Sequence, residues 1–279
     1  MDFISLIFIT ILGLAVGSFL NVVIVRYPKI LEAQWQQEYQ FYLHQSSEEP
    51  NKSAYTLARP ASHCPFCQTP LKWWHNIPVI SFILLKGKCS FCQQAISWQY
   101  PLVEMLCGGL SLWAALHLGV DSHLIWSLIF IWTLLAIAWI DFQTQLIPDD
   151  MVLPLLWLGL LVNIHAGFTP LSQAVIGAVT GYLFLWIVAK LFKWIRKKEG
   201  MGHGDFKMLA CLGAWFGVQL VPILLLIAVI LSLLASLSLL LLKKINWQQL
   251  IPFGPFLAIS GWLALMFGNQ LIDIAAKIF

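Results

Sequence analysis

Two aspartates lie where the chain passes between strongly apolar and polar sequence. Asp141 directly follows the apolar run 124–140, and Asp205 closes the glycine-rich segment 200–205 just before another apolar run. An ionised carboxylate at the edge of a bilayer is costly, so an acid in this position is by default a candidate functional residue. Two carboxyl groups that share one proton can activate a water molecule for attack on a peptide carbonyl. This is the chemistry of an aspartic protease.

The segment before Asp205 favours close approach of a peptide, because three of its five residues are glycine. Glycine adopts positive φ and leaves room for an extended substrate backbone. Structural interpretations stay open: Asp205 or Asp149 as a helix N-cap, and Asp141 as an interfacial acid bonded to loop backbone. Lys207 either acts on a neighbouring aspartate or anchors its helix at the membrane surface.

Four cysteines form a second constellation, with the spacing C-x2-C-x21-C-x2-C. Two such pairs predict a tetrahedral thiolate site for zinc, and a reducing compartment favours metal over a disulfide. A redox dithiol and free cysteines are the alternatives. Four thiolates leave no open coordination position, so we expect a structural zinc that folds the surrounding loop. The metal ligands predicted are Cys64, Cys67, Cys89 and Cys92.

The composition indicates a membrane protein. Of the 279 residues, 59% are hydrophobic and 10% are charged, and several apolar runs exceed the roughly 18 residues that a spanning helix needs. We therefore expect an all-α polytopic membrane protein with about eight transmembrane helices in the lipid bilayer. The expected spans lie near residues 3–25, 102–120, 123–141, 150–167, 171–194, 205–217, 219–242 and 253–276.

These spans predict three parts: a first transmembrane helix at 1–25, a cytoplasmic domain with the zinc site at 26–100, and a transmembrane peptidase domain at 101–279. A helical excursion is expected over Leu31–Tyr55, and a break around Gly217–Pro222 divides the long apolar stretch there. Pairs of glycines four residues apart let helix backbones approach closely. They are Gly13/Gly17, Gly177/Gly181 and Gly213/Gly217.

The positive charges predict the orientation. All but Lys277 of the 16 Lys and Arg residues fall in three hydrophilic stretches that lie on one side if eight helices alternate. The positive-inside rule puts those stretches in the cytoplasm and both termini outside. Acids such as Glu32 and Glu48 are interspersed, which argues against a basic patch for nucleic acid.

Taken together, these elements resemble the type IV prepilin peptidases, bacterial membrane enzymes of the GxGD aspartic protease group. The resemblance covers nearly the whole chain. A single GxGD motif would be weak evidence for this family, whereas the ordered set of motifs is specific for it. The motifs are Gly17–Val23 with Arg26 and Pro28, the two cysteine pairs, Asn76–Ser81, Ile96-Ser97, Tyr100–Glu104 with Gly108, Asp141–Asp149, Gly202–Lys207 and Phe253–Phe256.

The resemblance implies two reactions. The first is removal of the positively charged leader of prepilins and pseudopilins at the cytoplasmic membrane boundary, with Asp141 and Asp205 matching the family's catalytic aspartates. The second is N-methylation of the new amino group, with S-adenosylmethionine as donor. Glu104 and Gly108 match the E-x3-G element linked to methyl transfer. The sequence shows no glycine-rich nucleotide-binding unit of its own, so the methyl-donor site would be unconventional.

The resemblance also implies a place in the bacterial inner membrane, in type IV pilus assembly or protein secretion. Two alternatives remain open from the sequence. One is a GxGD protease of other specificity, such as a preflagellin-type enzyme. The other is a zinc-stabilised membrane scaffold or proton-coupled transporter that uses Asp141 and Asp205 as a relay. For Asn21 and Arg26, anchoring the loop and binding the substrate are both open.

Overall fold

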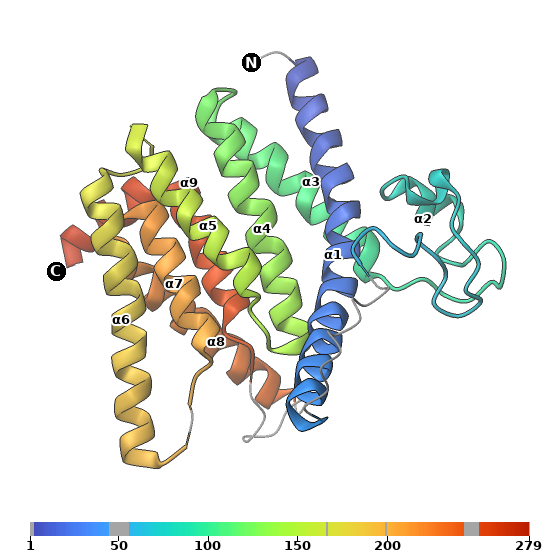
Figure 1. The fold of residues 1–279 in the computed structure, drawn as a ribbon. Coiled ribbons are helices and arrows are strands. Elements are labelled where there is room, and N and C mark those ends of the chain that lie inside the picture. Colours follow the sequence, from blue (N-terminus) through green and yellow to red (C-terminus); the bar gives the residue numbers. More distant parts are fainter. Residues whose placement is uncertain (1–2, 45–55, 166, 199, 243–250, 279) are drawn as a thin grey trace. The chain divides into compact units, whose positions relative to one another are not determined.

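The computed structural model describes residues 3–44, 56–165, 167–198, 200–242 and 251–278. Over these residues the chain is predominantly helical, without strands beyond isolated bridges. The eight predicted apolar segments all form helices (Figure 1). Six of these helices are long and apolar enough to cross a membrane, so the protein is a multi-pass α-helical membrane protein. Its contacts divide it into two compact units, Met1–Val120 and Asp121–Phe279.

The first unit consists of α1 (Phe3–His44), η1 (Trp73–Asn76), α2 (Ile80–Leu84) and α3 (Gln99–Leu118). The span predicted to end at residue 25 is part of a longer helix, since α1 continues without interruption through Pro28 to His44. The sequence 26–44 contains no glycine that could end the helix in the left-handed conformation, and Pro28 lies within the helix without ending it. The helical excursion is confirmed as far as His44, and its remainder, 45–55, lies outside the described residues.

Small residues let α1 and α3 approach each other closely, as the first glycine pair predicted. A Cβ added to Gly17 would lie 2.8 Å from the Cα of Glu104, and one added to Gly13 would lie 2.5 Å from the Oγ of Ser111. Side chains at these positions would force the two backbones apart. The glycines of α1 therefore place Glu104 directly against this helix.

Arg26 connects α1 to the polar segment that follows. Its side chain is 6% exposed, and Nη1 donates to the carbonyl oxygens of Thr56, Leu57 and Pro60 at 3.3, 3.1 and 2.8 Å. A buried guanidinium needs such acceptors. Of the two interpretations open for Arg26, the structure therefore shows the loop anchor.

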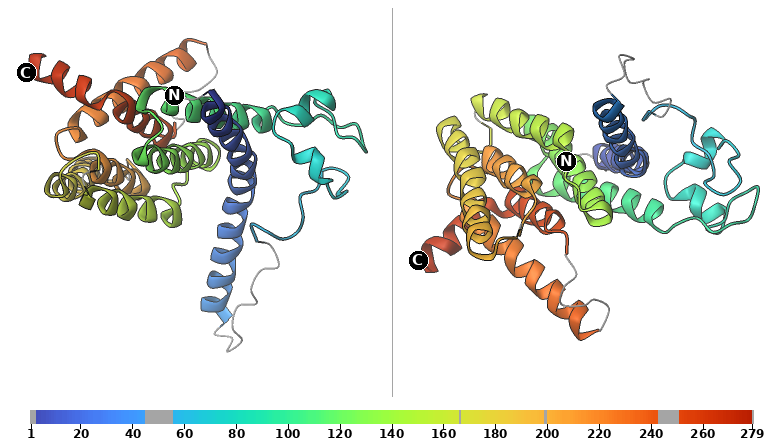
Figure 2. Two further views of the ribbon diagram at one scale, coloured as in Figure 1. Left: turned by 90° about the horizontal axis from the view of Figure 1, so that it is seen from above. Right: turned by 60° about the horizontal axis from the view of Figure 1, so that its bottom comes forward.

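The second unit consists of α4 (Ser122–Thr144), α5 (Asp149–Val162), η2 (Asn163–His165), α6 (Leu171–Arg196), α7 (His203–Phe216), α8 (Val221–Leu241) and α9 (Gly254–Ile278). Helix α7 lies inside this unit and contacts α5, α6, α8 and α9 (Figure 2). From Asp205 onward, every residue of α7 except Lys207 is buried. The predicted break is confirmed, because α7 ends at Phe216 before Gly217, whose φ is 82°.

The backbones of α6 and α7 touch. A Cβ added to Gly177 would lie 2.5 Å from the carbonyl oxygen of Gly213, and one added to Gly181 would lie 2.7 Å from that of Leu209. A Cβ on Gly213 would in turn overlap the carbonyl of Gly177. Such contact gains van der Waals energy between helices where lipid supplies no hydrophobic driving force. It fixes how deeply α7 lies against α6.

Hydrogen bonds fix the other end of α7. The buried Asn163 donates through Nδ2 to the carbonyl oxygens of Ala214 and Trp215 at 2.9 and 3.1 Å, and its Oδ1 accepts from the Phe168 N–H at 2.7 Å. The Trp215 indole donates to the Leu155 carbonyl at 2.8 Å. Carbonyls at a helix C-terminus lack partners within the helix, so these bonds satisfy groups that burial would otherwise leave unpaired.

The α6–α7 contact predicts the effect of one added methyl group. We expect Gly213→Ala to lower the free energy of unfolding by about 1–3 kcal/mol, since the methyl overlaps backbone that cannot move aside. Gly109→Ala is the matched control, because a Cβ at Gly109 meets nothing within 4 Å, and we expect it to be neutral or stabilising by up to ~1 kcal/mol. Unfolding by denaturing detergent measures both variants, and equal stabilities would contradict the contact.

Candidate active site and metal centre

Asp141 lies in the last turn of α4 and is 4% exposed. Its Oδ2 accepts a hydrogen bond from the backbone N–H of Gly254, the first residue of α9, at 2.9 Å. A Cβ on Gly254 would lie 2.6 Å from this oxygen, so only glycine allows the helix to begin so close to the carboxyl group. The start of a helix offers unpaired N–H groups and a partial positive charge to an acid.

Asp205 lies in the first turn of α7 and is 8% exposed. The N-cap of this helix is Gly202, so the N-cap interpretation of Asp205 is wrong. Gly202 lies beside the carboxyl group, since a Cβ added there would be 3.6 Å from Oδ2 of Asp205. At Gly202, the glycine-rich segment therefore approaches the carboxyl group of Asp205 with its backbone alone.

Ile147, in the segment between α4 and α5, lies close to residues that neighbour each of the two aspartates. A Cβ on Gly254 would lie 3.1 Å from Cδ1 of Ile147, and one on Gly204 would lie 2.7 Å from its Cβ. The same side chain therefore lies against the glycine that bonds Asp141 and the glycine that precedes Asp205. The fold brings together two acids that are far apart in the sequence.

Lys207 pairs with Asp149 rather than with either buried aspartate. Its Nζ lies 2.7 and 2.6 Å from the two carboxylate oxygens of Asp149, and the two side chains are 26% and 51% exposed. Such exposed pairs contribute about 0–1 kcal/mol. The N-cap interpretation of Asp149 is also wrong, because Pro148 occupies that position and Asp149 is the first helical residue.

The four cysteines converge as the spacing predicted. All four sulfur atoms lie within 4.8 Å of one another, and the Sγ atoms of Cys64 and Cys92 are 3.8 Å apart. Zn–S bonds of about 2.3 Å in a tetrahedron place sulfurs about 3.8 Å apart, so the cluster fits a metal ion of this size. Each pair is followed by a glutamine in the left-handed region, Gln68 at φ 57° and Gln93 at φ 59°.

The local backbone prepares some of these thiols to be ligands. Hydrogen bonds from the side chain and backbone of Thr69 lower the pKa of Cys67 to about 6, and those from the backbone of Cys92 and Phe91 lower the pKa of Cys89. The pKa of Cys92 is raised to about 11 by burial and the neighbouring thiols, despite the Gln94 N–H. Four thiols in this volume cannot all ionise without a cation to balance them.

Glu104 and Gly108 lie on the face of α3 that meets α1. Glu104 is 7% exposed and its Oε2 accepts from the Val79 N–H at 2.8 Å. A Cβ on Gly108 would lie 2.8 Å from the Leu14 side chain, so Gly108 serves helix packing and leaves no open cradle for a nucleotide. Asn21, 2% exposed, donates to the Tyr100 carbonyl, while its Oδ1 has no partner among the described residues.

For S-adenosylmethionine, these residues therefore fit only in part. A carboxyl group and an unpaired amide oxygen suit a cationic or amine-bearing ligand. The described residues around them form no glycine-rich phosphate or nucleotide cradle.

Two residues around the aspartates had no role assigned from the sequence. Gly254 and Ile147 are more than 100 positions apart, and each is unremarkable in its own segment. A glycine followed by proline at the start of an apolar run does predict a helix start. Which acid that start would contact depends on the packing of α9 against α4.

The apolar helices define a multi-pass membrane protein, and its second unit holds two buried aspartates. Two family models match the chain: the bacterial peptidase A24 N-terminal domain over residues 11–118, and the type IV leader peptidase family over residues 128–237. Curated relatives match nearly its whole length, and each is named prepilin leader peptidase/N-methyltransferase. The chain therefore belongs to the prepilin leader peptidase/N-methyltransferase family.

The relatives come from several bacteria. The protein of Stutzerimonas stutzeri is 47% identical over 94% of this chain and 90% of its own. That of Aeromonas salmonicida (strain A449) is 46% identical over 96% and 91%, and that of Pseudomonas aeruginosa is 46% identical over 94% and 90%. No solved structure matches the chain significantly.

The cysteine cluster predicts how metal content responds to mutation. We expect Cys64→Ser to lose at least about nine-tenths of the zinc bound by the wild type, because a serine hydroxyl is not deprotonated at neutral pH and a three-thiolate site binds far more weakly. Cys107→Ser, a buried cysteine of α3 outside the cluster, is the matched control and should keep about one zinc per chain. Elemental analysis of the purified proteins measures both, and full zinc content in Cys64→Ser would refute the site.

Proposed function

We propose that this protein removes the leader peptide of type IV prepilins and pseudopilins and N-methylates the residue that cleavage exposes. The names of its relatives and the two family models support this activity. The observation that carries the peptidase half is the convergence of two buried acids, Asp141 and Asp205, around Ile147 and the start of α9. The experiments below test each half separately.

We assign catalysis of cleavage to Asp141 and Asp205. Two neighbouring carboxyl groups titrate as a pair, and the state with one proton between them holds both a base and an acid. The ionised group takes a proton from water as the water attacks the scissile carbonyl. The protonated group hydrogen-bonds to that carbonyl oxygen and later protonates the leaving amine. Gly202 leaves space for an extended peptide backbone to reach the acids, because a Cβ there would meet only the Asp205 carboxyl group within 4 Å.

The placement in the membrane follows from the charges. We propose that the protein lies in the bacterial inner membrane, with both termini in the periplasm and the basic stretches in the cytoplasm. Asp141 lies in the last turn of α4 and Asp205 in the first turn of α7, so this orientation puts both acids at the cytoplasmic face. Residues 26–100 would then form a cytoplasmic domain around a structural zinc held by the four cysteines, and 101–279 the transmembrane peptidase domain.

We assign methyl transfer to the region of Glu104 and Gly108. S-adenosylmethionine would supply an electrophilic methyl group for the new α-amino group, which has an ordinary pKa near 8 and needs little help to be neutral. Glu104 offers a carboxyl group that Val79 orients. Gly108 acts through close packing of α3 on α1, which holds Glu104 in place.

Loss of either aspartate should stop cleavage. We expect Asp141→Asn and Asp205→Asn each to lower the rate of leader removal by at least about 10²-fold, because an amide neither accepts the water proton nor donates one in exchange. Asp273→Asn, which changes an exposed acid of α9, should cleave at the wild-type rate. Cleavage of a purified prepilin measures all three, alongside their accumulation in membranes. Robust cleavage by either dyad variant would remove that residue from the assignment.

The two reactions should separate at Glu104. We expect Glu104→Gln to keep cleavage and to lose most of the methylation, since the amide oxygen still accepts the Val79 N–H while the negative charge is gone. Incubation with prepilin and labelled S-adenosylmethionine, followed by mass spectrometry of the mature N-terminus, reports both reactions. Methylation by this variant at the wild-type level would exclude a role for the Glu104 charge. An unmethylated product from the wild-type protein would mean that only the peptidase activity of the proposal stands.

A further inference from the structure

The short helix α2, between the two cysteine pairs, has two different faces. On one face the ring of Phe82 packs against that of Trp98, with the ring centres 4.9 Å apart. The side chains of Ile80, Ile83 and Leu84 are 56%, 66% and 76% exposed, and they share another face because they are three and four positions apart. An exposed apolar cluster of this kind marks a surface that contacts a partner.

Two hydrogen bonds tie this segment to the spanning helices of its own unit. The N–H of Val79 donates to Oε2 of Glu104 at 2.8 Å, and Oγ of Ser18 donates to the carbonyl oxygen of Asn76 at 3.4 Å. The 20 residues of α3 extend over about 30 Å, the thickness of the hydrocarbon core, and Glu104 lies about 7.5 Å inside the start of this helix. Ser18 lies within the apolar part of α1. Both bonds therefore place the start of α2 at the depth of the membrane boundary.

The backbone of this segment can leave water, because its donors are paired. The N–H groups of residues 80, 81, 83 and 85–88 donate to carbonyl groups within 77–85, and that of Val79 donates to Glu104. An unpaired N–H group is costly in contact with lipid, so a segment at this depth needs such partners.

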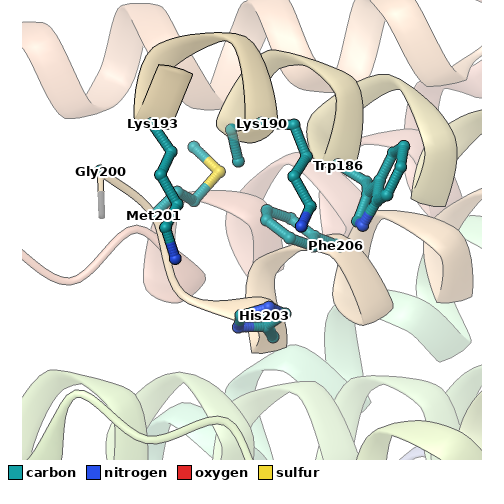
Figure 3. Close-up of a pocket in the computed structure, with 8 residues that line it drawn as sticks. Trp186, Lys190, Lys193, Gly200, Met201, His203 and Phe206 are labelled. Atoms are coloured by element: carbon teal, nitrogen blue, oxygen red, sulfur yellow. The ribbon is translucent and has the colours of Figure 1, made fainter. Parts of the chain in front are cut away.

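Tryptophan and lysine lie next to the apolar residues. Trp73 belongs to η1, which contacts α2, and is 75% exposed. The ammonium group of Lys72 lies 5.0 Å from the ring centre of Trp74. The same pairing occurs near the C-terminal end of the spanning helix α6, where that of Lys190 lies 5.5 Å from the ring centre of Trp186 (Figure 3). Tryptophan favours the boundary between membrane and water, and a lysine there extends its charge to the headgroups.

The charge of this part of the chain suits an anionic surface. Residues 50–103 contain no Asp or Glu, and the exposed Lys72, Lys86 and Lys88 flank the apolar residues on both sides. Anionic lipids attract basic segments that lie next to a spanning helix, and Trp98 directly precedes α3. A lipid bilayer therefore accounts for the depth, the apolar side chains and the charge together.

We propose that α2 is a membrane anchor, whose side chains Ile80, Ile83 and Leu84 insert among the acyl chains at their boundary with the headgroups. The lysines that flank this face contact the headgroup phosphates. This part of the segment between the cysteine pairs thus lies in the membrane surface instead of extending into the cytoplasm. The anchor does not depend on the proposed peptidase activity.

The test is the accessibility of position 84 in the full-length protein, reconstituted in nanodiscs of phosphatidylcholine and phosphatidylglycerol. A fluorescent amino acid replaces Leu84, and its quenching is measured with nitroxide-labelled lipid and with acrylamide in the water. Tyr42 is the matched control, because it is 80% exposed and lies about 36 Å along α1 from Ser18. At Leu84 we expect nitroxide quenching at least about threefold stronger than at Tyr42, and acrylamide quenching at least about threefold weaker.

A second measurement changes the apolar face itself. With the label at Leu84, Ile80→Ser/Ile83→Ser should weaken nitroxide quenching by at least about threefold, because two of the three inserted side chains are lost. Phe41→Ser/Leu43→Ser, which changes two exposed apolar residues near the end of α1, should leave it unchanged. A zinc content of about one per chain in both pairs will show that the cysteine segment is folded.

Several results would overturn the proposal. Strong acrylamide quenching at Leu84 without nitroxide quenching would show that α2 extends into water. Protection from both quenchers would show that protein covers this face, either the second unit or a second copy of the chain. Protection that appears only when a prepilin is added would assign the face to the substrate. Equal nitroxide quenching with and without Ile80→Ser/Ile83→Ser would show that these side chains do not hold the segment in lipid.

Discussion

The backbone contact between α6 and α7 is the constraint on which the second unit depends. The backbones of the two helices meet without side chains between them at Gly177, Gly181 and Gly213. At the C-terminal end of α7, Asn163 donates hydrogen bonds to two backbone carbonyl groups of the helix. Helix α7 can therefore lie inside the unit although it has only 14 residues. Because Asp205 is in its first turn, the depth of α7 sets the depth of this acid. A displaced α7 would move Asp205 away from Ile147 and from the surroundings of Asp141.

Two buried carboxyl groups need polar partners, and the fold supplies backbone groups rather than basic side chains. The N–H of Gly254 donates a hydrogen bond to Asp141, and Gly202, which has no side chain, lies beside the Asp205 carboxyl group. Lys207, two residues after Asp205 in the same helix, is paired with Asp149. A lysine between the two acids would hold both in the ionised form, and the shared proton that acid–base chemistry requires would be lost.

Much of this could be predicted from the sequence, because each correct prediction had a local cause. Apolar length predicted the helical segments, glycine spacing predicted the close contacts of α1 and α6, and the cysteine spacing predicted the thiol cluster. The errors arose where local patterns allow more than one outcome. An acid near a helix start can cap it or follow the cap, and Asp149 and Asp205 both follow it. The first helix continued past its apolar part, since a polar sequence can extend a helix as well as end it, and Pro28 did not end this one.

Length of apolar runs, residue type and spacing were thus sufficient to determine a multi-pass helical protein, a four-thiol site and two acids at the ends of helices. Only the tertiary structure decided which groups surround those acids. The N–H of Gly254 and the side chain of Ile147 reach them through the packing of α9 against α4 and of α7 against α6. The physical reason is that a sequence pattern reports the periodicity of one helix, whereas the neighbours of a buried carboxyl group depend on how several helices pack.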